Sequence, residues 1–393
     1  MSGCQVAIIA DDLSGALDAT APFAARGADA RVVISLEALA ETLGTWQGQW
    51  PEVIAVNTES RHLQAEQAAL RVSEAARLLT QAAPRQWFKK VDSTLRGQVI
   101  AECRALRKAV GLPLLLAPAV PAQGRVVCNA EVWVEGHRLA ETDYQQDARS
   151  APMIGPIDQA FAANGLPLQR YRPGQITPLP SADCIADAES DVELAAIYGL
   201  LDTGSGRAMA GAAGLAAAMA QGCFGPPVAP FRSLHGVKKV LYAVGSRSSR
   251  AAEQLQQLRQ CTPDLAVVEA CADKPYGTHA LSACVVVPGC HETERTASEV
   301  ADAMAAQVKS ITAIWKKHEE SLLFLTGGDI AMAVLSQTNA RHISVETEWS
   351  PGVALGYVNG DKRQRVMTKA GGFGDPQLLV RLHQQAKLTA GSE

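Results

Sequence analysis

Features that would place this protein in several common classes are scarce in its sequence. The net charge is only −4, from 36 basic and 40 acidic residues, and no long run of Lys and Arg alternates with aromatic residues. Nucleic acids and anionic membrane surfaces attract concentrated positive charge, so both are poor candidates for partners. No apolar run reaches the roughly 18 residues that span a bilayer, and no basic leader with a cleavage pattern opens the chain. We therefore expect a soluble, cytoplasmic protein.

Disulfide and zinc chemistry are also poorly represented. The nine cysteines are an odd number and lie scattered, with no C-x-x-C pair and no Cys/His cluster at zinc spacing. Such a pattern is typical of reduced, small, buried side chains in the cytosol. The eight His are isolated from one another, and we interpret each as structural or on the surface. The sequence therefore offers no metal site made by protein side chains.

Four catalytic signatures are missing as well. The patterns G-x-x-x-x-G-K-[ST], G-x-S-x-G and H-E-x-x-H do not occur, and no G-x-G-x-x-G opens the first expected helix. These absences disfavour P-loop NTPases, α/β-hydrolases, zinc proteases and ordinary NAD dehydrogenases.

The length and the alternation of the chain predict its architecture. At 393 residues the chain is too long for one core and indicates about two domains of roughly 150 to 200 residues. Apolar runs alternate with helical stretches in both halves, which predicts an α/β fold with a mainly parallel sheet flanked by helices in each domain. Pro and Gly cluster at residues 222–230, the best candidate for a linker. We place the domains at residues 1–235 and 236–393, with the active site in the cleft between them.

Polar loops follow four apolar runs of the first half. The richest loop, Lys-Lys-Val-Asp-Ser-Thr-Leu-Arg-Gly at 89–97, comes directly after Trp87 and Phe88. Because the carboxyl ends of parallel strands meet at one edge of a sheet, these loops would gather carboxylates and arginines there. Each residue also has a structural interpretation, since Asp is a common helix cap and the charges could form an internal ion-pair network. In chain order the loops carry Asp11 with Asp12, Arg61, Asp92 with Arg96, and Arg125. Beyond them, from 132 to 168, the pattern is weak and predicts only a hairpin near Glu135.

Glycine-rich loops follow three apolar runs of the second half, each just before an expected helix. Their sequences are Gly-Ser-Arg-Ser-Ser from 245, Gly-Gly-Asp from 327, and Ala-Gly-Gly-Phe-Gly-Asp from 370. Helix N-termini present free N–H groups and a positive dipole end, and glycine lets a phosphate approach the backbone. A single Gly-Gly pair is more often a turn that needs positive φ. Three such loops on one sheet nevertheless favour a nucleotide site.

Together the two halves suit phosphoryl transfer from a nucleoside triphosphate to a small, polyhydroxylated anion. In that reaction the protein positions the reactants, an Asp accepts the hydroxyl proton and Mg²⁺ bridges the phosphates. The candidates for this base are Asp12 and Asp92, and the flanking Lys90 and Arg96 would keep Asp92 ionised. Two alternatives stay open, a nicotinamide-dependent oxidoreductase and a non-catalytic sugar-phosphate sensor. The first would be expected to carry an early glycine fingerprint, and the second has no need of paired acids.

The same residues resemble the four-carbon acid sugar kinases over nearly the whole chain. The matching motifs are residues 9–15, 57–61, 89–97, 121–125, 139–143, 210–216, 245–246, 324–331 and 368–374. The resemblance implies ATP-dependent phosphorylation of the terminal (4-) hydroxyl of a tetronate. The N-terminal domain would bind the sugar acid, and the C-terminal domain would bind ATP with Mg²⁺. The motif Thr-Gly-Gly-Asp-Ile-Ala from 326 is more similar to D-threonate kinases than to 3-oxo-tetronate kinases. We therefore predict D-threonate as the substrate, with D-erythronate and 3-oxo-tetronates as alternatives.

Carried over motif by motif, the resemblance implies two sets of contacts, to which the loop pattern adds Arg125. The expected sugar-acid contacts are Asp11, Asp12, Arg61, Lys90, Val91, Asp92, Ser93 and Arg125. The expected nucleotide contacts are Ser246, Thr326, Gly327, Gly328, Asp329, Gly371, Gly372 and Gly374. The chain departs from the family's pattern after Asp143 and is short just before residue 240, which leaves the choice of tetronate open. A homodimer is among the assemblies that fit this interpretation.

Overall fold

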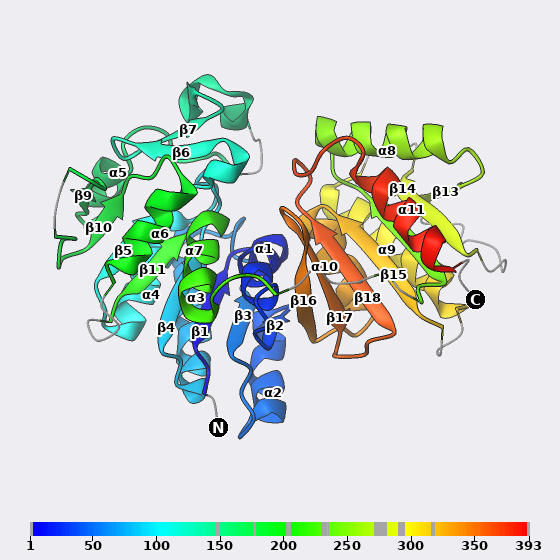
Figure 1. The fold of residues 1–393 in the computed structure, drawn as a ribbon, viewed down its shortest axis with the longest axis horizontal. Helices are drawn as coiled ribbons and strands as arrows, with labels where there is room; N and C mark the ends of the chain where they lie inside the picture. The colour runs from blue at the N-terminus through cyan, green and yellow to red at the C-terminus, as the bar shows by residue number, and fades with distance from the viewer. Residues whose placement is uncertain are drawn as a thin grey trace. The chain divides into compact units, whose positions relative to one another are not determined.

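The computed structural model describes residues 3–146, 150–175, 178–201, 206–228, 234, 236–270, 281–289, 295–315 and 319–390. The chain divides into two compact units, unit 1 (Met1–Val228) and unit 2 (Ala229–Glu393), which run from blue to green and from green to red in Figure 1. Each unit is an α/β fold with a mainly parallel sheet flanked by helices, as the sequence predicts. The boundary expected near residue 235 falls outside the described residues.

The sheet of unit 1 is parallel throughout its described pairings. Its core strands are buried on both faces, as in β1, where every residue from Val6 to Ala10 is buried. Burial on both faces explains why these strands read as continuous apolar runs and not as an alternating pattern. In spatial order the strands are β2 (Ala30–Val33), β3 (Val53–Asn57), β1 (Val6–Ala10), β4 (Gln86–Lys90), β11 (Ala208–Gly211), β5 (Leu114–Ala117), β10 (Cys184–Ala186) and β9 (Gln169–Tyr171).

The helices of unit 1 form two packed groups. Helix α7 packs against both α1 and α6, whereas α3 packs against both α2 and α4. The bounds are α1 (Leu13–Ala24), α2 (Leu36–Trp46), α3 (Ala65–Leu79), α4 (Val99–Val110), α5 (Ile157–Ala163), α6 (Asp191–Gly199) and α7 (Ala213–Phe224). Short 3₁₀ helices lie at η1 (Thr80–Ala82), η2 (Pro121–Gln123), η3 (Leu139–Glu141) and η4 (Asp143–Gln146).

Two local expectations for unit 1 are wrong. The alanine-rich sequence up to Ala25 predicts an amphipathic helix, but in α1 all residues except Asp18 are buried, because the helix packs against the sheet and α7 at once. The proposed linker at 222–230 begins too early, since residues up to Phe224 continue α7. Glycine and proline there follow a helix end at Gly225, whose φ is +78°.

A small antiparallel sheet accompanies the main sheet of unit 1. It consists of β6 (Arg125–Cys128), β7 (Glu131–Val134) and β8 (His137–Arg138). Val134 pairs with His137 across a turn at residues 135–136, so the predicted hairpin is confirmed. Because β6 begins at Arg125, this sheet fixes the backbone of that arginine.

The sheet of unit 2 is mixed. Strands β13, β14, β12, β15 and β18 pair in parallel, and β17 then pairs antiparallel with both β18 and β16. In spatial order the bounds are β13 (Ala266–Ala270), β14 (Ala283–Pro288), β12 (Lys239–Val244), β15 (Ser321–Thr326), β18 (Gln364–Lys369), β17 (Val353–Val358) and β16 (His342–Ser350). The antiparallel pair β16–β17 has no counterpart among the elements expected from sequence.

Helices of unit 2 also form two pairs, in which α9 packs on α10 and α8 packs on α11. Their bounds are α8 (Ser249–Cys261), α9 (Ala297–Ala313), α10 (Gly328–Gln337) and α11 (Leu378–Ala390). A cluster that includes Tyr242, Phe324 and Leu382 forms the core on the α11 side. Across the described ranges, no helix combines the length and the apolar character that crossing a membrane requires.

The cysteines of the described ranges agree with the expectation of unpaired thiols. All seven are free, and four of them are buried: Cys4, Cys103, Cys184 and Cys284. Burial raises the pKa of the Cys103 thiol to about 12. A thiol that stays protonated is a poor nucleophile, so Cys103 is a packing residue.

Candidate active site

Three polar loops of unit 1 start side by side at the carboxyl edge of the sheet. Strand β1 lies between β3 and β4, and its last residue, Ala10, is in register with Asn57 and Lys90. The loops that begin at Asp11, Thr58 and Val91 are therefore neighbours in space. The prediction that these loops gather at one edge of the sheet is confirmed.

Arg61 holds both aspartates of the first loop. Its Nε and Nη2 donate to Asp11 at 2.7 and 3.0 Å, and its Nη1 and Nη2 donate to Asp12 at 2.8 and 2.9 Å. Four of the five N–H donors of a guanidinium are thus engaged. Arg61 is among the expected sugar-acid contacts, but in this structure two carboxylates of the protein itself accept these four hydrogen bonds. One N–H, on Nη1, remains for a ligand.

The charges of this cluster are strongly coupled. Asp11 is 2% exposed, and burial alone would raise its pKa. Arg61 and Lys89 more than offset burial, so the pKa of Asp11 lies below its usual value. Asp11 therefore stays ionised and acts as a fixed negative charge at the sheet edge.

Asp12 also caps a helix. It is the N-cap of α1, and its Oδ1 accepts a hydrogen bond of 2.8 Å from the backbone N–H of Gly15. A Cβ on Gly15 would lie 2.5 Å from the same oxygen, so only glycine leaves room for this contact. The structural interpretation of Asp12 as a helix cap is therefore confirmed.

The loop after β4 folds around Asp92. Arg96 binds this carboxylate with two donors at 2.9 and 3.0 Å, and Thr94 donates to it from both its backbone and its hydroxyl. Burial would raise the pKa of Asp92, but Arg96 holds it well below the usual range. The loop includes Leu95 at φ +59°, an uncommon left-handed conformation for a leucine. Asp92 is thus the organising acceptor of its own loop.

Arg125 and Lys90 bring positive charge to the same edge. Arg125 Nη1 donates to Ser93 Oγ at 2.6 Å, and its guanidinium lies over the Tyr144 ring at 5.5 Å. The Lys90 side chain belongs to a residue that is 5% exposed, and its ammonium donates to the carbonyl oxygen of Val91 at 3.0 Å. Val91 itself is buried at 1% exposure, so only its backbone is available to a ligand. Lys90, Ser93 and Arg125 therefore lie close to one another, as expected.

The sequence reasoning missed two residues near this cluster, Glu102 and Asp18. Glu102 forms a fully buried ion pair with Lys89 at 3.2 Å and also accepts a hydrogen bond from Ser60. Asp18, one turn after Gly15 on α1, interacts electrostatically with Lys90 and Arg125. It lies three residues after Gly15, on the same face of the helix, and a Cβ on Gly15 would lie 3.4 Å from the Lys90 ammonium.

In unit 2 the three glycine loops also start from adjacent strands. Strand β15 lies between β12 and β18, and Thr326 is in register with Val244 and Lys369. Gly371 approaches Ser246 so closely that a Cβ on the glycine would overlap the serine hydroxyl. The loops at 245–248, 327–328 and 370–374 are therefore brought together, as the sequence predicts.

Two helices begin at these loops. Ser248 caps α8, whereas α10 begins after Gly327, at φ +101°, with no side-chain cap. The exposed Asp329 lies in the first turn of α10. The buried hydroxyl of Thr326 has no hydrogen-bond partner within the part of the chain described. The start of α10 therefore presents uncapped N–H groups beside glycine, the arrangement that binds phosphate in other proteins.

The Lys369 side chain supports the glycine loop at residues 370–374. Its buried ammonium donates to the carbonyl oxygens of Ala370, Gly371 and Phe373 at 3.0, 2.8 and 3.0 Å. Burial lowers the pKa of Lys369 to about 8. On the other side, Gln254 donates to the carbonyl oxygens of Phe373 and Asp375 at 3.1 and 2.8 Å. The loop is therefore held in one shape by two buried side chains that the sequence analysis did not single out.

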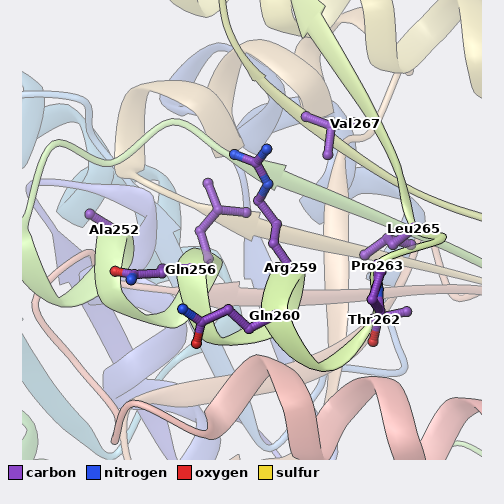
Figure 2. Close-up of a pocket in the computed structure, with 9 residues that line it drawn as sticks. Ala252, Gln256, Arg259, Gln260, Thr262, Pro263, Leu265 and Val267 are labelled. Carbon is purple, nitrogen blue, oxygen red and sulfur yellow. The ribbon is translucent and has the colours of Figure 1, made fainter.

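Two surface pockets lie away from both clusters. One has a volume of about 500 Å³. It is lined by α8 residues such as Arg259 and by Thr262, Pro263, Leu265 and Val267 (Figure 2). Another, of about 440 Å³, lies in unit 1 near Gln86 and Tyr198, at the start of β4. No residue of the predicted site lines either pocket.

Comparisons with known proteins match both halves of the chain. Residues 6–219 match a family model described as a sugar-binding N-terminal domain, and residues 286–379 match one described as a nucleotide-binding C-terminal domain. A D-threonate kinase of Bordetella bronchiseptica is 30% identical over 98% of both chains. This chain belongs to the four-carbon acid sugar kinase family.

Other members of the family agree with this assignment. A D-threonate kinase of Cupriavidus necator is 31% identical over 95% of each chain. A D-erythronate kinase of Heliobacterium modesticaldum is 32% identical over 41% of this chain and 35% of its own.

Solved structures show the same fold. A Haemophilus influenzae protein of the DUF1537 family has a TM-score of 0.73 at 16% identity, covering 98% of this chain and all of its own. A DUF1537 protein of Bordetella bronchiseptica, a domain-swapped dimer with bound citrate, has a TM-score of 0.51 at 26% identity over 98% of both chains.

Proposed function

We propose that this four-carbon acid sugar kinase uses ATP to phosphorylate the terminal (4-) hydroxyl of D-threonate. The observation that carries the proposal is the cluster at the sheet edge of unit 1, where Asp11, Asp12 and Arg61 meet the cations Lys90 and Arg125. Carboxylates accept the hydroxyl hydrogens of a sugar acid, and cations bind its carboxylate. Relatives named D-threonate kinases, alike over nearly the full length, support the choice of this acid.

The positively charged groups of the cluster would bind the carboxylate of the sugar acid. Arg125, stacked on Tyr144 and hydrogen-bonded to Ser93, is pre-oriented to bind an anion. The remaining N–H of Arg61 and the ammonium of Lys90 would add further donors. Citrate bound to the related Bordetella bronchiseptica protein supports a small hydroxylated carboxylate as the ligand class.

The glycine loops of unit 2 would bind the nucleotide. Uncapped N–H groups at the start of α10 suit phosphate oxygens, and Gly372, where a Cβ would meet no atom within 4 Å, leaves space for a ligand. Mg²⁺ would arrive with the phosphates of ATP. In solution a homodimer is a reasonable assembly, because the Bordetella bronchiseptica relative is a domain-swapped dimer.

ADP release measures the proposed activity directly. The purified protein would be mixed with ATP, Mg²⁺ and, separately, D-threonate, D-erythronate and 3-oxo-tetronates. We expect the highest kcat/KM with D-threonate, and phosphate on the 4-oxygen of the product by NMR. A higher kcat/KM for D-erythronate would move the substrate to that acid, whereas no ADP above the acid-free control for any tetronate would refute the kinase proposal.

A matched pair of variants tests the role of Arg125. Arg125→Lys keeps the charge but loses the planar fork, so we expect KM for the tetronate to rise about tenfold or more, the size of a lost charge-assisted hydrogen bond. KM for ATP should not change. Arg104→Lys, at an exposed arginine of α4, is the control and should leave both constants unchanged. Equal KM values for the two variants would remove Arg125 from the binding site.

A further inference from the structure

We propose that Asp18 is the general base that takes the proton from the attacking hydroxyl of the sugar acid. The proposal rests on the proposed kinase function and changes its expected chemistry, because the sequence points to Asp12 or Asp92. It depends on three observations: how the other carboxylates are occupied, where Asp18 lies, and which charges surround it.

The other carboxylates at the edge are committed to the protein. Asp11 and Asp12 share the guanidinium of Arg61, and Asp92 is bound by Arg96 through two donors. A carboxylate whose oxygens accept several charge-assisted hydrogen bonds is stabilised as an anion and is a weak proton acceptor. These three aspartates are therefore suited to fix the site's geometry and charge.

Asp18 differs from them in its contacts. Within the described residues it makes no hydrogen bond and no ion pair of the kind that holds the other three. It is also the one residue of α1 that is not buried, although it sits in a helix enclosed on all sides. A polar side chain kept partly accessible in such a helix is available to a ligand.

The position of Asp18 places it at the same cluster. It lies one turn beyond Gly15, and a Cβ on Gly15 would be 3.4 Å from the Lys90 ammonium. The charged groups that act on Asp18 come from three elements and a loop: Lys90 of β4, Asp12 at the start of α1, Arg125 of β6 and Asp92 after β4. The Asp18 carboxylate thus interacts electrostatically with both cations that are expected to bind the sugar acid.

The balance of these charges favours a basic carboxylate. The partial burial of Asp18 among packed elements raises its pKa, Lys90 and Arg125 lower it, and Asp12 and Asp92 raise it, with a net rise above the usual value. The pKa of Asp92 is shifted the opposite way. A general base accepts a proton more effectively when its pKa is closer to the working pH. Asp18 is therefore better suited than Asp92 to act as the base.

The step that follows is balanced. The 4-oxygen forms a bond to the γ-phosphorus of ATP as the bond from that phosphorus to the β–γ bridging oxygen breaks and ADP leaves. The hydroxyl proton passes to the Asp18 carboxylate, which later releases it to water. Lys90 and Arg125 take no part in the proton transfer, and both would bind the substrate carboxylate.

Kinetics of Asp18→Asn test the assignment. With D-threonate, or whichever tetronate the wild type turns over, we expect kcat to fall by about 10²- to 10⁴-fold, the usual contribution of a general base. The Kd values for the tetronate and for ATP should stay within about threefold of wild type. The wild-type kcat should fall on the acidic side with one titrating group, and the residual rate of Asp18→Asn should lack that limb. Asp191→Asn, at an exposed residue of α6, is the matched control and should behave as wild type.

The outcomes separate this inference from the proposed function. A wild type that phosphorylates no tetronate would refute the kinase proposal itself. An active wild type whose Asp18→Asn variant keeps kcat within about threefold, or keeps the acidic limb, would overturn the role of Asp18 alone. If Asp18→Asn melts at a lower temperature than wild type, Asp18→Glu decides: partial kcat with a shifted acidic limb supports the base, and an unshifted limb refutes it.

Discussion

Replacing Arg61 by alanine would leave two carboxylates at the sheet edge without the cation that binds both. The Arg61 side chain is 13% exposed, Asp11 is 2% exposed and Asp12 is 20% exposed, so the pair with Asp11 is effectively buried. Removing one partner of a buried ion pair costs about 3–5 kcal/mol, whereas exposed pairs contribute about 0–1 kcal/mol. Because the Arg61–Asp11 pair is buried, the larger range applies. We expect Arg61→Ala to lower the free energy of unfolding by about 3–5 kcal/mol at pH 7.

The pH dependence of this loss follows from the pKa of Asp11. In the wild type its pKa is lowered, so its contribution to stability is present above the unfolded pKa and is lost as the pH falls through the lower folded value. Without Arg61, burial and the neighbouring Asp12 would raise that pKa, and Asp11 would take up a proton in mild acid. The difference in stability between wild type and Arg61→Ala should therefore shrink as the pH falls from 7 toward 4.

Urea unfolding at several pH values measures both quantities. Unit 1 contains the buried Trp46 and Trp87, whose fluorescence reports its unfolding, and a chain of two units needs separate fits of any separate transitions. Arg77→Ala removes a solvent-exposed pair with Glu74, with side chains 66% and 45% exposed, and should leave the urea midpoint close to that of wild type. A loss for Arg61→Ala as small as that of the control, or one that does not change with pH, would refute the reasoning.

Three further predictions concern the loops of unit 2 and the buried pair of unit 1. Gly371→Ala should destabilise unit 2 by about 1–3 kcal/mol because its Cβ overlaps Ser246, whereas Gly372→Ala, in open space, should stay within about 1 kcal/mol; equal melting temperatures would contradict this. Nucleotide affinity, measured by calorimetry, should fall as the pH rises through about 8, because Lys369 then loses its proton and its hydrogen bonds to three carbonyl groups weaken. The Lys369→Met variant should bind nucleotide weakly at every pH. A wild-type affinity that does not change between pH 7 and 9 would contradict this role of Lys369. Glu102→Gln should cost about 3–5 kcal/mol by removing the carboxylate that pairs with the buried ammonium of Lys89, and an unchanged urea midpoint would show that the pair contributes little.

The sheet edges could be predicted from the sequence because they follow from strand geometry alone. Once Val6–Ala10, 53–56 and the run before Lys89 are read as parallel strands, their carboxyl ends must share an edge, and the polar loops come with them. The same logic brings the glycine loops of unit 2 together. Strand order therefore predicts where each loop lies, but it does not predict which partner each side chain contacts.

The missed features depend on tertiary packing. Asp18 interrupts a helix that is buried all round, where an apolar period carries no information about which face meets a ligand. The role of Lys369 follows only from the hydrogen bonds that its ammonium donates to the carbonyl groups of the loop, which the sequence does not show. The strands at 342–350 and 353–358 pair antiparallel at the end of a parallel sheet, where the half-exposed β16 has a weaker apolar signal.

Through Asp12, binding of a ligand at the sugar-acid cluster is coupled to the stability of the first turn of α1. The Oδ1 of Asp12 is shared by the Gly15 amide and by Arg61, at 2.8 and 2.9 Å. A ligand that draws donors of Arg61 toward itself leaves that oxygen more fully to the amide, and coupling of this kind is reciprocal. The rate at which the Gly15 amide exchanges its hydrogen with solvent is therefore a local reporter, within one peptide group, of whether the sugar-acid cluster is filled.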